Sequence, residues 1–296
     1  MKIVVTGGTG FLGSALAESL VADGNDVVVL SRFSGGAYKG VRYATLAGAA
    51  AEIDGAGAVV NLAGAGIADR RWTTARKAVL RQSRVSVTRA VVTAIANATS
   101  KPRVLVSGSA VGYYGSSLDA VFDESSPAGH DFLAELCAEW EREALAAEPH
   151  TRVVILRTGL VLGPNGGLLK KMIPPFRMFA GGPVGSGRQW MSWIQLADWI
   201  ALVKLAIATD SARGPVNVVA PAPVTNRDFS TALGRALHRP SLLPLPEFVV
   251  RAIFGELADG ALLASQNVRS RQALVQNYTF KSVTVQDGIK ASIIPA

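Results

Sequence analysis

The chain has 296 residues, of which 49% are hydrophobic and 18% are charged, and its net charge is +8. This length allows either one large α/β domain or a domain with a smaller lobe, and the composition excludes a mainly disordered chain. Since no run of about 18 uncharged apolar residues is present, we expect no membrane-spanning helix and no membrane partner. One cysteine and three scattered histidines exclude an intrachain disulfide and provide no metal-ligand spacing. The N-terminus leads into an apolar strand without a cleavage site, which predicts a cytoplasmic protein.

Strands and helices alternate along most of the chain. Apolar β-rich runs predict strands over residues 2–6, 27–30, 58–62, 103–107, 152–157 and 216–219. Helical periodicity predicts helices over 12–23, 73–98 and 131–147, and over the part of 193–207 that follows a strand end. This alternation predicts an α/β fold with a doubly wound parallel sheet. Gly and Pro predict loops around one helix between 163 and 187, and the chain after 226 is expected to be mainly helical.

A glycine-rich turn joins the first predicted strand to the first predicted helix. Glycines at positions 7, 10 and 13 permit a tight turn and a close approach of the backbone to a ligand. The helix that follows offers free N–H groups and a positive dipole end to a pyrophosphate. Because strand, turn and helix occur together, the segment predicts a Rossmann-type dinucleotide site. The candidate cofactor-binding residues here are Gly7, Thr9, Gly10, Phe11, Leu12 and Gly13.

The end of the second predicted strand indicates which dinucleotide binds. NAD sites usually place an acidic residue there, but this chain has Ser31 and Arg32 and no acid before Glu52. Arg32 can pair with a 2′-phosphate, and Ser31 can hydrogen-bond it, which favours NADP(H) over NAD. The alternative is that Arg32 is only a surface cation. We include Ser31 and Arg32 among the cofactor-binding residues.

Basic residues gather between positions 70 and 103. On a helix Lys77, Arg81 and Arg84 lie on one face. They form either a solvated cationic face or a surface that attracts the phosphates of an anionic cofactor or substrate. No aromatic-interleaved basic motif accompanies them, so we expect no nucleic-acid partner.

Several segments resemble the extended short-chain dehydrogenases/reductases. They are 6–13, the sequence Asn-Leu-Ala-Gly at 61–64, and 107–115. Further segments are similar to the epimerase-like subgroup of the NAD-dependent epimerase/dehydratase family, which has a small C-terminal domain: 71–73, 83–85, 131–135, 140–141, 157–163, 187–193 and 244–266.

The resemblance extends over essentially the whole chain. It implies an NADP-binding Rossmann domain over 1–220, with 160–190 contributing to a substrate-binding lobe that occupies 221–296. It also adds Leu62, Ala63, Gly64 and Ser107 to the cofactor-binding residues.

One departure from this family concerns catalysis. Short-chain reductases use a Tyr-x-x-x-Lys pair, in which the tyrosine is the acid/base and the lysine lowers its pKa and holds the nicotinamide ribose. If Glu141 is aligned with the acid that often follows the pair, Leu133 and Cys137 stand at the tyrosine and lysine positions. The usual proton donor is therefore absent.

Nearby side chains are alternative candidates. Ser109 matches the family serine that polarises a substrate carbonyl, although it could simply cap a turn. Tyr113 or Tyr114 is a substitute acid, or else packs over the cofactor. Cys137 is either a redox-sensitive thiol or a small core residue, and Asp131 is either a helix N-cap or a base.

Aromatic and basic residues also occur near the expected substrate region. Trp190, Trp193 and Trp199 form either an aromatic wall for a ligand or the packing of the lobe. Arg157 and Arg188 are candidate contacts for a diphosphate.

Two functions are consistent with these residues. The first is an NADP(H)-dependent epimerase or reductase acting on a small molecule such as a sugar nucleotide, with Ser109 and one of the two tyrosines, Tyr113 or Tyr114, as catalytic residues. The second is a catalytically inactive NADPH-binding protein that reports redox state to a partner. Either a monomer or a homodimer is compatible with the sequence.

Overall fold

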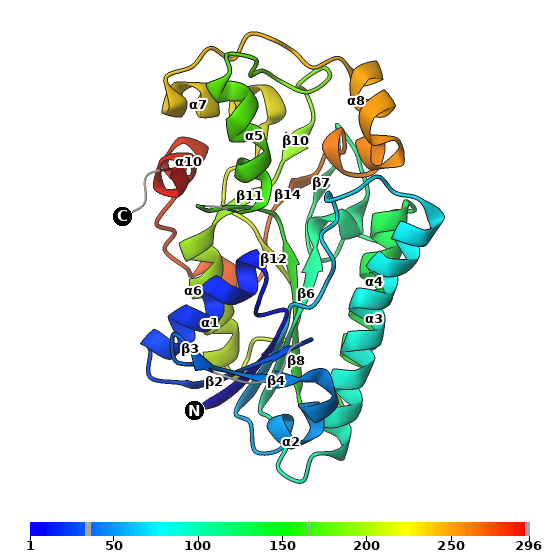
Figure 1. Cartoon of the computed structure of the whole chain (residues 1–296), viewed down its shortest axis with the longest axis vertical. Coiled ribbons are helices and arrows are strands. Elements are labelled where there is room, and N and C mark those ends of the chain that lie inside the picture. The colour runs from blue at the N-terminus through cyan, green and yellow to red at the C-terminus, as the bar shows by residue number, and fades with distance from the viewer. Residues whose placement is uncertain (33–36, 165, 294–296) are drawn as a thin grey trace.

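An eight-stranded sheet forms the centre of the computed structural model, which describes residues 1–32, 37–164 and 166–293 (Figure 1). The strand order is β12-β8-β6-β5-β1-β2-β4-β3, and every pair is parallel except β3 with β4. The strands are β1 (Lys2–Thr6), β2 (Asp26–Ser31), β3 (Ala37–Tyr38), β4 (Val41–Thr45), β5 (Ala58–Asn61), β6 (Val104–Ala110), β8 (Arg152–Thr158) and β12 (Gly214–Val218). The doubly wound sheet expected from the sequence is confirmed.

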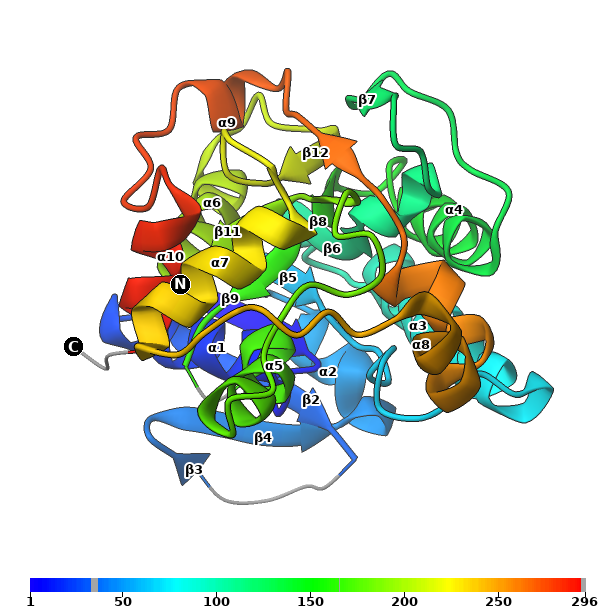
Figure 2. The same ribbon diagram turned by 90° about the horizontal axis from the view of Figure 1, so that it is seen from above.

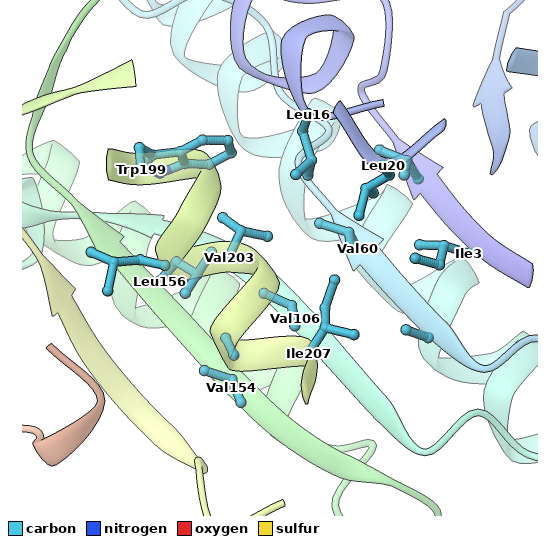
Figure 3. Close-up of a cluster of buried hydrophobic side chains, with 14 of the residues drawn as sticks. Ile3, Leu16, Leu20, Val60, Val106, Val154, Leu156, Trp199, Val203 and Ile207 are labelled. Atoms are coloured by element: carbon cyan, nitrogen blue, oxygen red, sulfur yellow. The ribbon is translucent and has the colours of Figure 1, made fainter. Parts of the chain in front are cut away.

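Helices cover both faces of this sheet, which explains why its central strands are mainly apolar. One face carries α1 (Phe11–Ala22) and α6 (Leu196–Ala208), and the other carries α2 (Ala49–Ile53), α3 (Thr74–Asn97) and α4 (Phe132–Leu145) (Figure 1). Figure 3 shows the first of these interfaces, in which Leu16 and Leu20 of α1 and Trp199 of α6 pack towards the strands. Alternate strand residues point to opposite faces, as in the adjacent pair Val4 and Val5.

The observed helices and strands lie within a few residues of the predicted ones. The sequence reasoning missed β3, β4 and α2, which lie between the second and third predicted strands. β4 is a short edge strand of mixed polarity, Val-Arg-Tyr-Ala-Thr, and its pairing with β2 makes it a strand. That pairing is not visible in the local sequence.

A second group of elements lies beyond the carboxyl ends of the parallel strands. It contains α5 (Gly167–Arg177), α7 (Asn226–Leu237), α8 (Glu247–Phe254), α10 (Val285–Ile293) and three short strand pairs: β9 (Leu160–Leu162) with β11 (Trp193–Gln195), β10 (Trp190–Met191) with β13 (Val224–Thr225), and β7 (Val121–Phe122) with β14 (Asn267–Val268). A separate core, including Phe176, Trp193, Phe229 and Ile289, holds much of this group together. Seen from above in Figure 2, α5 and α7 overlie the strands. The division of the chain at residue 220 stays a prediction.

The C-terminal segment returns to the sheet layer and is fixed there by a buried carboxylate. Asp198 of α6 is fully buried and accepts hydrogen bonds from the Tyr278 hydroxyl (2.8 Å), the Lys281 N–H (2.8 Å) and the Ser282 N–H (3.1 Å). Burial, together with the hydrogen bond to Asp198, raises the pKa of Tyr278. The short helix α9 (Ala273–Gln276) precedes this contact and packs on α6.

Candidate functional site

The glycine turn lies where the strand order reverses, between β1 and β5. Gly7 has φ +71°, and a Cβ there would lie 2.5 Å from the Leu62 carbonyl oxygen. A Cβ on Gly13 would lie 2.3 Å from the Gly7 carbonyl oxygen, so neither position accepts a side chain. Gly10 is the N-cap of α1 and supplies no side-chain hydrogen bond, which leaves the first helical N–H groups open to a ligand. This geometry suits a pyrophosphate at the switch point of an open sheet.

The residues around the turn differ in their surroundings. The Phe11 ring packs on the loop before α5, since a Cβ on Gly166 would lie 2.0 Å from the ring. Thr9 is exposed and, with Gly8, lines a hollow of about 210 Å³ between α1 and β4. Leu12 is half-buried. Together these residues could hold the phosphate end of a dinucleotide.

Arg32 is exposed immediately after β2, next to the half-buried Ser31. In a parallel sheet the end of β2 lies beside the end of β1, so Arg32 is at the same edge as the glycine turn. A guanidinium at this place fits a 2′-phosphate.

Hydrogen bonds fix the loop that follows β5. The Thr6 hydroxyl donates to the Asn61 amide oxygen (2.6 Å) and accepts from the Ala63 N–H (3.2 Å). The Asn61 amide group donates to the hydroxyls of Thr88 (2.7 Å) and Ser107 (3.3 Å). Leu62 and Ala63 are thereby held beside Gly7, with Gly64 next in the chain, and the part of these three residues in cofactor binding stays a prediction. Ser107 is fully buried, so its side chain supports β5, and its part in cofactor binding stays a prediction.

A buried ion pair lies beneath the candidate catalytic residues. Arg157 of β8 holds Glu141 of α4 in a two-pronged contact, Nε to Oε1 at 2.9 Å and Nη2 to Oε2 at 2.8 Å. Their side chains are only 4% and 7% exposed. The Ser109 hydroxyl donates to the same Glu141 Oε1 at 2.6 Å. Arg157 also donates to the Tyr114 hydroxyl at 3.0 Å, and that hydroxyl donates to the Asn217 amide oxygen at 2.6 Å.

This network changes how the candidate hydroxyls can act. The proton of Tyr114 is directed at Asn217, and burial raises the pKa of Tyr114 to about 12, so Tyr114 is a poor acid in this arrangement. The proton of Ser109 is directed at Glu141, which leaves its oxygen able to accept but not to donate towards a ligand. Tyr113 is half-buried, with its ring centroid 3.5 Å from Arg157 Cζ. Among the described residues its hydroxyl has no hydrogen-bond partner.

Burial separates the arginines and tryptophans expected near the substrate region into those that can contact a ligand and those that cannot. Arg157 is not a diphosphate contact, because its guanidinium is occupied by Glu141 and Tyr114 inside the protein. Trp193 and Trp199 are fully buried, in the two different cores, and therefore serve packing. Trp190 is half-buried and Arg188 is exposed, so both can still meet a ligand.

Helix α4 presents no acid or cation at the positions of the family pair. Leu133 is half-buried against an apolar cluster that includes Trp72 and Leu136. Cys137 is buried, and this burial raises its pKa to about 11, which fits a core residue and not a reactive thiol. Asp131 caps α4 by accepting the Ala134 N–H at 2.9 Å, in agreement with its interpretation as an N-cap.

The three cations on this face of α3 do not share one environment: Lys77 and Arg81 are partly exposed and ion-paired, as on a solvated face, whereas Arg84 is half-buried. Lys77 pairs with Glu256 at 2.7 Å and Arg81 with Glu139 at 2.9 Å. Arg84 instead turns inward. The helical spacing of these residues is as predicted, but Lys77 and Arg81 are paired with carboxylates from neighbouring elements.

The sheet, its switch point and the glycine turn together define a Rossmann-type dinucleotide-binding fold. Residues 3–219 match the model of the NAD dependent epimerase/dehydratase family, and residues 245–291 match a domain of unknown function, DUF1731. The chain therefore belongs to the NAD-dependent epimerase/dehydratase family, as the resemblance indicated.

Relatives of the chain extend over nearly all of it. The chloroplastic SDR39U1 homolog of Arabidopsis thaliana, an epimerase family protein, is 43% identical, over 98% of this chain and 86% of the relative. Human epimerase family protein SDR39U1 is 38% identical, over 95% of each chain. Since the plant relative is named as chloroplastic, the cytoplasmic location of this chain stays a prediction.

Solved structures agree with the fold. A crystal structure of human SDR39U1 with NADPH has a TM-score of 0.93, at 36% identity and over 99% of each chain. MoeE5 in complex with UDP-glucuronic acid and NAD has a TM-score of 0.79 at 20% identity, which supports the fold alone. Within the described ranges, no helix is both long and apolar enough to cross a bilayer.

Proposed function

We propose that the chain binds NADP(H) along the carboxyl edge of its sheet and catalyses an oxidoreduction or redox-assisted epimerisation of a small substrate. The observation that carries the proposal is the glycine turn with Arg32, and no acidic residue, at the end of the neighbouring strand. The NADPH in the human relative's crystal structure supports the same cofactor.

The test of the cofactor is an Arg32→Ala variant, measured by calorimetric titration with NADPH and NADH. Loss of a charge-assisted contact to the 2′-phosphate is expected to weaken NADPH binding by about tenfold to a hundredfold. NADH, which lacks that phosphate, should bind as before. Arg142→Ala, an exposed arginine in the last turn of α4, is the control and should leave both affinities unchanged. Equal NADPH affinity in Arg32→Ala and the parent protein would show that Arg32 is only a surface cation.

The residues present suggest a division of tasks. The turn and the start of α1 bind the pyrophosphate, and the nicotinamide supplies hydride chemistry when the cofactor is bound. Ser109 lies at the carboxyl end of β6, where its oxygen accepts a hydrogen bond and so orients a substrate hydroxyl. Tyr113 is the proton donor or acceptor in this proposal, because its hydroxyl is not committed to another residue of the described chain. Sugar nucleotides are the first substrate class to test.

The second candidate is an NADP(H)-binding protein without turnover. Leu133 and Cys137 favour it. The half-buried Leu133 and the buried Cys137 stand where the family has its catalytic tyrosine and lysine. NADPH consumption measured against a panel of carbonyl compounds and sugar nucleotides separates the two. Turnover of any member establishes the enzyme, whereas tight NADPH binding with no turnover across the panel favours the binding protein.

A further inference from the structure

Arg84 differs from the other cations of α3 in its surroundings. It is half-buried, and its guanidinium donates to two backbone oxygens, Leu80 O at 3.2 Å and Ala65 O at 3.1 Å. Its Cζ lies 5.3 Å from the centre of the Trp140 ring. These contacts direct the head group away from solvent and towards the loop after β5.

No carboxylate neutralises this cation in the ranges that the structure describes. Lys77, Arg81 and Arg89, on the same helix, each pair with a glutamate at 2.9 Å or less. Burial lowers the pKa of Arg84, which is the expected effect of removing a charge from water. Because an unpaired, partly desolvated charge is costly, its presence here calls for an electron-rich ligand.

The position of the guanidinium coincides with the route expected for the cofactor. A Cβ on Gly64 would lie 2.9 Å from Arg84 Cζ, so Arg84 borders the loop that is held beside Gly7. The Trp140 ring on which it lies also contacts β6, since a Cβ on Gly108 would be 2.9 Å from that ring. Arg84 is therefore between the pyrophosphate-binding turn and Ser109, where the nicotinamide half of a dinucleotide would extend.

Arg84 is also near the place where the usual lysine is missing. Its positive charge acts on the Cys137 thiol, opposing the effect of burial on that pKa. Cys137 occupies the lysine position of the family pair if Glu141 is aligned as described above. A cation is thus present near the lysine position, but it comes from α3 and not from α4.

We propose that Arg84 binds the hydroxyl groups of the nicotinamide ribose of NADP(H), in place of the absent lysine. This inference rests on the proposed cofactor. A guanidinium has five N–H donors, and the two backbone oxygens leave donors for a ribose. Arg84 is in this view a cofactor-binding residue that the dinucleotide motifs do not include.

The test uses ligands that contain different parts of the cofactor. NADPH and NADH carry the nicotinamide ribose, whereas 2′,5′-ADP carries only the adenosine end and its phosphates. Arg84→Met is expected to weaken NADPH and NADH by about tenfold to a hundredfold and to leave 2′,5′-ADP unchanged. Arg84→Lys keeps the positive charge but lacks the planar set of N–H donors of a guanidinium, so it should weaken NADPH and NADH binding less than Arg84→Met does. Arg32→Ala should give the opposite pattern, weakening NADPH and 2′,5′-ADP but not NADH.

Arg76→Met is the matched control, because Arg76 is on the same helix and also donates to a carbonyl oxygen of the same loop, that of Gly66. It should leave the binding of NADPH, NADH and 2′,5′-ADP unchanged. If Arg84→Met and Arg84→Lys bind NADPH as tightly as the parent, the ribose contact is wrong. Equal weakening of all three ligands would assign Arg84 a structural task and overturn the proposal. If the parent protein binds NADPH no more tightly than 2′,5′-ADP, the nicotinamide half adds no affinity and the ribose contact is likewise overturned. If the parent protein binds neither NADPH nor 2′,5′-ADP, the proposed function itself is refuted.

Discussion

Replacing Arg157 with methionine would remove the cation from the buried pair with Glu141. Glu141 would keep the Ser109 hydroxyl as a donor but lose both N–H groups of Arg157, at 2.8 and 2.9 Å. Removing one partner of a buried ion pair costs about 3–5 kcal/mol, because the other charge stays buried and uncompensated. For a chain of this size that corresponds to a fall in Tm of roughly 5–8 °C.

Two further variants show whether burial is the cause. Arg157→Met combined with Glu141→Leu removes both charges and should recover much of the loss, since the desolvation of the remaining carboxylate disappears. Arg89→Met breaks an ion pair with Glu143 in which Arg89 is 63% exposed, and should cost less than about 1 kcal/mol.

Urea denaturation followed by far-ultraviolet circular dichroism gives the free energies of unfolding for the parent, Arg157→Met, Glu141→Leu, the double variant and Arg89→Met. A double-mutant cycle then yields the coupling energy between Glu141 and Arg157. Should Arg157→Met cost no more than Arg89→Met, or should the double variant be less stable than the single one, the reasoning from buried charge would be refuted.

Two other predictions follow from close packing and from burial. Gly13→Ala places a methyl group 2.3 Å from the Gly7 carbonyl oxygen and should abolish NADPH binding, while Gly48→Ala, whose nearest neighbour is 3.9 Å away, should bind normally in the same titration; full binding by Gly13→Ala would contradict the turn geometry. Burial raises the pKa of Cys137 from its usual value near 9 to about 11, so the folded state keeps a proton that the unfolded chain loses in this range. Stability should therefore fall as pH rises from about 9 to about 11, by about 2–3 kcal/mol, and fall less in Cys137→Ala; parallel stability curves for the two proteins would exclude this cause.

Local patterns were sufficient to predict the sheet and the dinucleotide turn. Gly7, Gly10 and Gly13 are close in sequence, and the apolar runs on either side identify a strand before them and a helix after them. A glycine-rich turn predicts a dinucleotide site only in that context. The parallel sheet followed from strand runs that are apolar on both faces. These features depend on neighbours within a few residues, which a sequence displays directly.

The polar network could not be predicted, because its members are far apart in the chain. Ser109 and Glu141 are separated by 32 positions, and Tyr114 and Asn217 by 103. Arg157 looked like a free arginine near a substrate site, and only its position on a central strand shows that it is buried. A signal was present: Arg157 directly follows the apolar run 153–156, and an arginine that continues a central strand requires a partner.

The same limitation applies to Arg84. Spacing placed it with Lys77 and Arg81 on one helical face, but spacing does not show which neighbours pack on that face. The pairing of Lys77 and Arg81 depends on Glu256 and Glu139, which belong to other elements. Side chains with the same periodicity can therefore differ in solvation, charge pairing and function.

The contact between Asp198 and residues 278–282 affects how the chain folds during synthesis. Asp198 belongs to a helix that covers the sheet, yet the three groups that satisfy its carboxylate leave the ribosome about eighty residues later. Until then this carboxylate must remain hydrated, since burying it unpaired would be costly. We therefore expect the surface of α6 around Asp198 to stay hydrated in the nascent chain until the C-terminal segment supplies these donors. Folding of this layer is therefore completed only after translation has passed residue 282.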